Sequence, residues 1–213
     1  MSAKASLAVP IACEEDQMKS ARPLLIIAAL AIAAAAALYA FSSDLFDRPP
    51  QPSLIGGPFQ MVDQTGKPVD QEILQGKWSA VFFGFTYCPD VCPATLQALS
   101  AAVPLLKPAE AKKLQIVFVS VDPARDTPAQ VKLYLDSQRL PAGTIGLTGS
   151  QVQVDTIAKA YRVVHEKAGE GADYTMNHST AVYLMDPKGR FDSVLAYGLT
   201  PPQMAELISK AMR

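Results

Sequence analysis

Two long apolar runs dominate the hydrophobic pattern of the chain. Residues 78–85 (WSAVFFGF) and 115–121 (QIVFVSV) contain almost no polar side chains. Runs of this length without alternation are typical of strands that are buried on both faces of a sheet. The two segments are therefore predicted to be central strands.

Shorter patterns on either side of these runs predict hairpins. Residues 59–62 alternate and lead into a turn at 64–67 (QTGK). Residues 182–186 and 191–196 flank the turn Pro187–Arg190, which contains Pro and Gly. Residues 161–166 are expected to form one more strand.

Capping signals predict where the helices begin. Thr127, Ser150 and Thr200 each precede a Gln by three residues, and Pro follows two of them at the first helical position. Helices are expected from these residues to about 138, about 160 and the end of the chain, and another over 94–106. Strands that alternate with helices before a closing hairpin and helix predict an α/β fold, a thioredoxin-like mixed sheet flanked by helices.

An uncharged segment near the start, residues 24–41, predicts a transmembrane helix. Basic residues precede it and mainly acidic ones follow, so the amino terminus is expected inside and the main domain outside. A cleaved signal peptide is the alternative, but no A-x-A site follows the run. The predicted organisation is a short cytoplasmic segment (1–23), the anchor (24–41), a Pro-rich linker (42–56) and the folded domain (57–213).

Composition excludes some classes of function. With 19 basic and 20 acidic residues the net charge is −1, so no basic excess indicates nucleic-acid binding. The three cysteines are too few for a disulfide-stapled scaffold. Cys88 and Cys92 lie close together, whereas Cys13 is far away and is interpreted as an incidental thiol.

The pair Cys88 and Cys92 has C-x-x-x-C spacing and lies between a predicted buried strand and a helix. A helix amino terminus favours thiolate over thiol, and low-pKa thiolates are metal ligands or redox nucleophiles. Pro93 fits best as the first helical residue. A structural disulfide is the alternative interpretation of the pair.

The sequence contains two histidines. His165 is expected at the surface. His178 is expected in a loop just before the closing hairpin, and in a thioredoxin-like order this loop faces the cysteine loop. Two sulfurs and one imidazole form a soft ligand set that suits copper as Cu(I) or Cu(II), although zinc would also accept it. Met176 is a possible weak additional ligand, but core packing is the commoner use of methionine.

Four segments together give a family resemblance. The sequence resembles the Sco/SenC family of copper-binding proteins, which assist assembly of the copper A centre of cytochrome c oxidase, in residues 86–93 (TYCPDVCP), 121–128 (VDPARDTP), 174–179 (YTMNHS) and 183–189 (YLMDPKG). The resemblance implies copper ligation by Cys88, Cys92 and His178. The family usually has Asp before the histidine, where this chain has Asn177. Asp122 and Asn177 are expected to support the ligands from outside.

These observations lead to one main hypothesis and two alternatives. The main hypothesis is a copper metallochaperone that delivers to the copper-bearing subunit of cytochrome c oxidase or to another copper protein. The first alternative is a thiol–disulfide oxidoreductase that uses Cys88 and Cys92 as its redox pair. The second is a copper or redox sensor. The expected location is the inner membrane, single-pass, with the domain in the periplasm or on the equivalent intermembrane-space side.

Overall fold

The computed structural model describes residues 26–36, 55–171 and 173–213. The chain divides into two compact units, Met1–Gln51 and Pro52–Arg213. Residues 26–36 of the first unit are helical and exposed. No helix among the described residues is both long and apolar enough to cross a membrane. The remainder of the predicted 24–41 anchor, the linker up to 54, and Cys13 lie outside the described residues.

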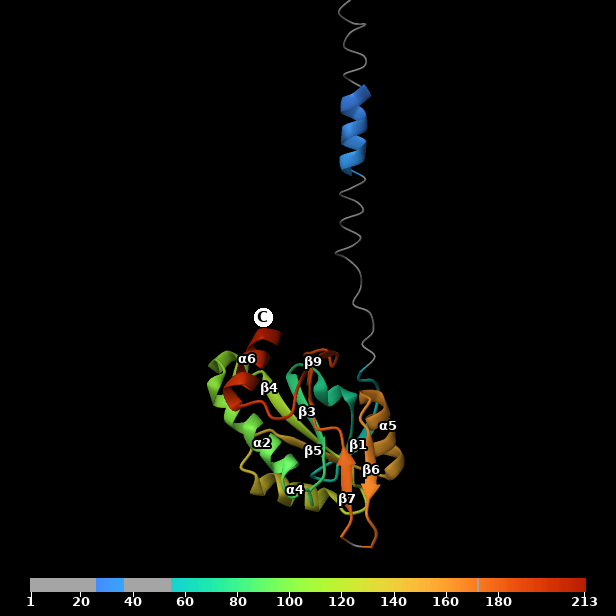
Figure 1. The fold of residues 1–213 in the computed structure, drawn as a ribbon, viewed down its shortest axis with the longest axis vertical. Helices are drawn as coiled ribbons and strands as arrows, with labels where there is room; N and C mark the ends of the chain where they lie inside the picture. Colours follow the sequence, from blue (N-terminus) through green and yellow to red (C-terminus); the bar gives the residue numbers. More distant parts are fainter. Residues whose placement is uncertain (1–25, 37–54, 172) are drawn as a thin grey trace, which may run out of the picture. The chain divides into compact units, whose positions relative to one another are not determined.

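The second unit is built on a seven-stranded mixed sheet (Figure 1). Its strand order is β2-β1-β5-β4-β3-β8-β9. The strands are β1 (Gln60–Asp63), β2 (Pro68–Asp70), β3 (Trp78–Gly84), β4 (Leu114–Ser120), β5 (Ile145–Thr148), β8 (Val182–Met185) and β9 (Phe191–Leu195). The predicted hairpins are β1–β2 and β8–β9, and each pairs antiparallel.

The two apolar runs form the centre of this sheet. β3 and β4 pair in parallel over their full lengths, with Trp78 opposite Leu114 and Gly84 opposite Ser120. All residues of each strand after the first are buried. The prediction of central strands is therefore confirmed, and the carboxyl end of β3 delivers the chain to the cysteine loop.

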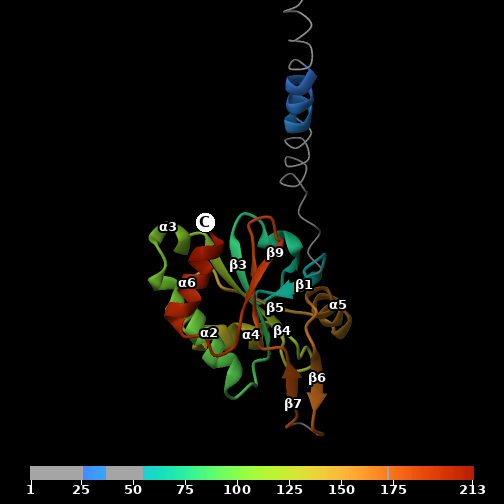
Figure 2. The ribbon, with the colours of Figure 1, turned by 45° about the horizontal axis from the view of Figure 1, so that its top comes forward.

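Helices cover the sheet, and the predicted capping signals place three of them correctly, those that begin after Thr127, Ser150 and Thr200. The helices are α2 (Val91–Ala102), α3 (Pro108–Ala111), α4 (Pro128–Ser137), α5 (Gln151–Tyr161) and α6 (Pro201–Ala211), with short 3₁₀ segments at Gln71–Leu74 and Val103–Leu105. The side chains of Thr127 and Ser150 accept the backbone N–H of the Gln three residues later. In Figures 1 and 2, α2 and α6 lie side by side, whereas α5 lies near β1.

A separate hairpin carries the histidines. β6 (His165–Ala168) and β7 (Thr175–His178) form a two-stranded sheet of their own and project at one end of the domain (Figure 2). Two expectations change here. Tyr161 ends α5 instead of opening a strand, and the segment before β8 is a strand instead of a loop. His165 and His178 are paired across this hairpin.

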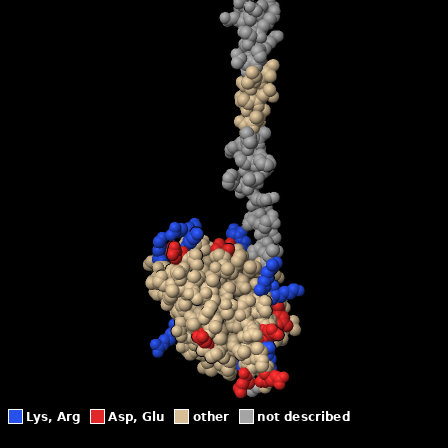
Figure 3. All heavy atoms as spheres, viewed as in Figure 1, with Lys and Arg blue, Asp and Glu red and all other residues tan. Residues whose placement is uncertain are grey.

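Charged side chains are sparse on the face shown in Figure 3. Uncharged residues fill its centre, and acidic side chains gather at the end where the β6–β7 hairpin lies. Exposed residues of that end are Glu166, Glu170 and Asp173. This face offers no broad basic surface, in agreement with the balanced charge of the chain.

Candidate metal centre

The cysteine loop joins β3 to α2. The helix begins at Val91, so Cys92 is its second residue and Pro93 its third. The expectation that Pro93 is the first helical residue is wrong. The first-turn N–H groups have no partner within the helix, so proline is tolerated anywhere in that turn. The helix therefore starts early enough to include Cys92.

Cys88 and Cys92 occupy different environments. Both are free thiols; Cys88 is partly exposed and Cys92 is fully buried. The backbone N–H of Cys92 donates to Sγ of Cys88 at 3.4 Å, so a sulfur accepts one of the free N–H groups of the helix end. Burial raises the pKa of Cys92 well above its usual value. The prediction of a low-pKa thiolate is therefore wrong for Cys92, because desolvation outweighs the hydrogen bond with the Phe85 backbone that lowers its pKa.

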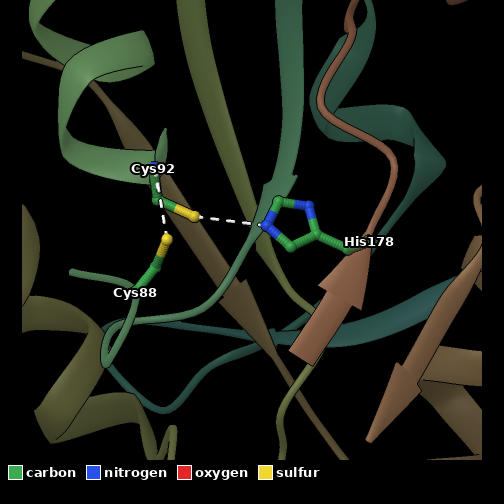
Figure 4. A group of neighbouring side chains, drawn as sticks. All are labelled: Cys88, Cys92 and His178. Carbon is green, nitrogen blue, oxygen red and sulfur yellow. Dashed lines mark hydrogen bonds between the residues drawn. The ribbon is translucent and has the colours of Figure 1, made fainter. Parts of the chain in front are cut away.

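His178 points its imidazole at the two sulfurs (Figure 4). Nε2 lies 3.4 Å from Sγ of Cys92. Nδ1 lies 2.9 Å from the backbone carbonyl of Ser179, an acceptor, so Nδ1 carries the proton and Nε2 presents its lone pair. Burial lowers the pKa of His178, against the hydrogen bond to Ser179, and so favours the neutral ring.

Aromatic side chains fix the plane of this ring. The rings of Phe82 and Phe85 meet the imidazole of His178 nearly edge-on, at centroid distances of 6.2 and 5.8 Å. Phe82 belongs to β3 and Phe85 follows it, so the strand that delivers the cysteine loop also supports the histidine. The ring is thus held by one hydrogen bond and two aromatic contacts.

The three ligand atoms converge. Sγ of Cys88, Sγ of Cys92 and Nε2 of His178 all lie within 4.8 Å of one another. Three ligands in a plane, each about 2.3 Å from a metal ion, lie about 4 Å apart. Shifts of less than about 1 Å in the distances between these atoms would therefore complete a three-coordinate site. The donor set of two sulfurs and one neutral imidazole suits a soft ion such as copper.

The residues expected to support the ligands behave differently from one another. Asp122 is buried and accepts hydrogen bonds from Arg125 Nε and the Tyr174 hydroxyl, both at 2.6 Å. It contacts no ligand directly and reaches the histidine hairpin through Tyr174. Asn177 is adjacent to His178 on β7 and is exposed. Alternation along a strand directs its side chain to the opposite face from the imidazole.

The remaining candidates lie beside the centre. Met176 shares its face of β7 with His178 and lines the same hollow as Cys88, while it packs against the core. The predicted surface position of His165 is wrong, because its side chain is only 15% exposed and lies 3.3 Å from the carboxylate of Asp155. Across the hairpin it sits opposite His178, and it is not among the converging ligands.

One supporting residue was missed by the sequence reasoning. Asp126 is fully buried, and its carboxylate accepts hydrogen bonds from the backbone N–H and hydroxyl of Thr86 and from the hydroxyl of Ser120. Thr86 lies two residues before Cys88, so Asp126 holds the start of the cysteine loop. The only signal for this role was its place in the 121–128 segment.

Comparison with curated proteins finds similar sequences in mitochondria and bacteria. The chain is 43% identical over 138 residues to Protein SCO1 homolog 1, mitochondrial, of Arabidopsis thaliana, covering 64% of this chain and 41% of the relative. It is 40% identical over 155 residues to Protein SenC of Rhodobacter capsulatus, covering 72% and 69%. The match spans less than half the length of the Arabidopsis protein and of Protein SCO2, mitochondrial, of Saccharomyces cerevisiae, at 41% and 47%.

Solved structures agree with this result and with the thioredoxin-like fold. Arabidopsis thaliana ScoI with copper bound superposes with a TM-score of 0.70 at 38% identity, covering 75% of this chain and 98% of that one. Bradyrhizobium japonicum ScoI with copper bound gives 0.66 at 41% identity, covering 74% and 99%. The SCO1/SenC family model matches residues 47–213. This match includes the whole of the second unit, Pro52–Arg213. The chain therefore belongs to the SCO1/SenC family.

Proposed function

We propose that the chain is a copper chaperone that carries one copper ion on Cys88, Cys92 and His178 and helps to assemble the copper A centre of cytochrome c oxidase. One observation carries the proposal. The three ligand atoms lie within 4.8 Å in a chain that is 38% identical to a ScoI solved with copper bound. Copper is the cargo here, in either oxidation state.

The geometry explains how copper could be taken up and released. His178 presents a neutral Nε2 and so binds without first losing a proton. The thiols must lose their protons to bind as thiolates, and these protons pass to solvent as the ion enters. Three ligands leave room for an acceptor's ligand to join before one of these leaves. The partly exposed Cys88 is the accessible sulfur for such an exchange.

The setting of this site is also part of the proposal. Residues 24–41 anchor the chain in the inner membrane as a single pass, residues 1–23 lie inside, and 42–56 tether the domain 57–213 outside the cytoplasm. The support is the uncharged run and its basic leading flank. The acceptor is the copper-bearing subunit of cytochrome c oxidase or another copper protein in the same compartment.

Replacement of each histidine in the full chain tests the ligand set. Copper-loaded wild type should show sulfur-to-copper charge-transfer absorption, and His178→Ala should lose it or shift it strongly. His165→Ala is the matched control, because His165 sits opposite His178 in the same hairpin and is outside the converging group. Unchanged copper content and spectrum in His178→Ala would overturn the three-ligand site. Absence of copper binding by wild type would overturn the proposed function.

A further inference from the structure

The position of His178 depends on how its hairpin is held. Among the described residues β7 pairs only with β6, and it belongs to a sheet separate from the one that delivers the cysteines. No ladder hydrogen bond therefore connects the histidine strand to β3 among the described strands. The short link 179–181 to β8, which pairs with β3, and contacts made by side chains therefore set the distance between His178 and the two sulfurs.

Tyr174, the residue immediately before β7, provides such contacts. Its hydroxyl donates to Oδ1 of Asp122 at 2.6 Å, and its backbone carbonyl accepts from Nη1 of Arg125 at 2.9 Å. The guanidinium carbon of Arg125 lies 3.6 Å from the centre of the Tyr174 ring. Arg125 therefore contacts the ring of Tyr174 and donates a hydrogen bond to its backbone.

The same guanidinium reaches the cysteine loop. Its carbon lies 4.8 Å from the ring centre of Tyr87 and 5.8 Å from that of Phe85. Tyr87 is the residue immediately before Cys88, and Phe85 also contacts the imidazole of His178. One side chain thus touches the segment that carries the first sulfur and the segment that carries the imidazole.

Arg125 is fixed in this place by its own partners. Nε donates to Oδ2 of Asp122 at 2.6 Å, and the side chain is only 17% exposed. Nη2 is buried and has no hydrogen-bond partner among the described residues. A buried donor without a partner is unfavourable, so hydrogen bonding alone does not explain this placement. The cation–π contacts of the guanidinium with the surrounding aromatic rings explain the rest, and the ammonium of a lysine has no planar face to present to these rings.

We propose that Arg125 is a positioning residue that clamps the cysteine loop to the histidine hairpin and thereby sets the approach of His178 to the two sulfurs. The claim that this clamp serves copper rests on the proposed function. The clamp itself is a property of the metal-free chain. One side of the clamp consists of Phe85 and Tyr87 and the other of Tyr174. The two sides are almost ninety positions apart in the sequence.

The test replaces Arg125 by lysine in the full chain. Arg125→Lys keeps the charge but loses the planar guanidinium that lies against the aromatic rings, together with its fork of donors. Arg190→Lys is the matched control, because Arg190 pairs with Asp186 at 2.6 Å at the turn between β8 and β9, away from the centre. The expected result is a loss of copper affinity of about 10- to 100-fold and an altered charge-transfer band in Arg125→Lys only. A purely structural role would lower the melting temperature and leave the band of bound copper unchanged.

A metal-free measurement separates this proposal from the proposed function. Backbone hydrogen exchange of residues 175–178 should be faster in Arg125→Lys than in wild type and unchanged in Arg190→Lys. Tyr174→Leu removes the other side of the clamp and should give the same two effects if Arg125→Lys does not fold. Wild-type copper affinity, spectrum and hydrogen exchange in these variants would overturn the clamp. Faster exchange in a chain that never binds copper would support the clamp and reject the copper function.

Discussion

Sγ of Cys92 lies 3.4 Å from Nε2 of His178, although the two residues are 86 positions apart in the sequence. Cys92 is fixed by the first turn of α2, whereas His178 is fixed by a hairpin outside the main sheet. The close approach of Cys92 and His178 therefore requires space around the Cys92 sulfur. That space comes from Gly84, the last residue of β3, because a Cβ placed there would lie 2.8 Å from this sulfur.

Gly84→Ala should disturb the copper site. The added methyl group would also lie 2.9 Å from the Phe118 ring, so neither neighbour can move away freely. We expect a loss of stability of about 1–3 kcal/mol together with weaker copper binding. Chemical denaturation measures the first effect, and chelator competition measures the second.

Gly146→Ala is the matched control for this substitution. Gly146 lies in β5, where a Cβ would overlap Val131 and Leu135 of α4 and would not meet a cysteine. Gly146→Ala should lower the free energy of unfolding by an amount similar to Gly84→Ala. The copper affinity of the folded protein should stay at the wild-type value. Equal copper affinity in both alanine variants would show that Gly84 does not set the position of the sulfur.

Asp122→Ala should be far more damaging than a typical loss of an ion pair. Asp122 and Arg125 are 3% and 17% exposed, so the substitution leaves a largely buried guanidinium and the Tyr174 hydroxyl without their acceptor. The expected loss is about 3 kcal/mol in the free energy of unfolding.

Asp136→Ala provides the comparison for Asp122. Asp136 and Lys132 also lie 2.6 Å apart, but their side chains are 62% and 55% exposed. Solvent screening reduces the expected loss there to about 0.5 kcal/mol or less. Urea denaturation of both variants decides the point, and similar losses would contradict the buried role of Asp122.

The cysteine loop could be predicted from the sequence because its determinants are local. An apolar run, a C-x-x-x-C segment and a following helix are neighbours in the chain, and capping signals fix three further helices. The four-residue β5 was not predicted, because its apolar stretch is too short to stand out. β7 (TMNH) was missed because it is polar and pairs only with β6.

The contacts that support the site could not be predicted in the same way. The hydrogen bond between Tyr174 and Asp122 joins residues 52 positions apart. Nothing in either local sequence specifies the other partner. The pKa of Cys92 was misjudged for a related reason, since its burial results from packing of α2 against the sheet and not from its place at a helix end.

The stability of the protein should depend on pH through Asp126. Burial raises the pKa of Asp126 in the folded protein, against its hydrogen bonds from Ser120 and Thr86. The contribution of Asp126 to stability is therefore fully present at a pH below its pKa in the unfolded chain, about 3.9. This contribution is lost as the pH rises through the higher pKa of the folded protein. Relative to Asp126→Asn, wild type should therefore lose stability as the pH rises above about 4.

Asp186 should change the stability of the protein with pH in the opposite direction. Burial would raise its pKa, but hydrogen bonds from Arg190 and Lys188 outweigh that effect and lower it. Its contribution is present above about 3.9 and is lost as the pH falls through the lower folded pKa. Denaturation of Asp126→Asn and Asp186→Asn should be followed from strongly acidic pH to neutrality. Relative to Asp186→Asn, wild type should gain stability as the pH rises towards about 3.9, and relative to Asp126→Asn it should lose stability as the pH rises further. Parallel curves would contradict both assignments.

Met176→Leu tests whether a thioether contributes to copper binding. Met176 lines the hollow beside Cys88 and His178, yet it also packs against the core. Leucine fills a similar volume without a sulfur, so a packing role predicts a stability change below about 1.5 kcal/mol. It also predicts wild-type copper affinity and an unchanged charge-transfer spectrum. Met212→Leu, in a partly buried methionine just after α6, is the control for the substitution itself. A weaker or shifted copper spectrum in Met176→Leu alone would instead establish the thioether as a fourth ligand, because leucine preserves the packing and removes only the donor atom.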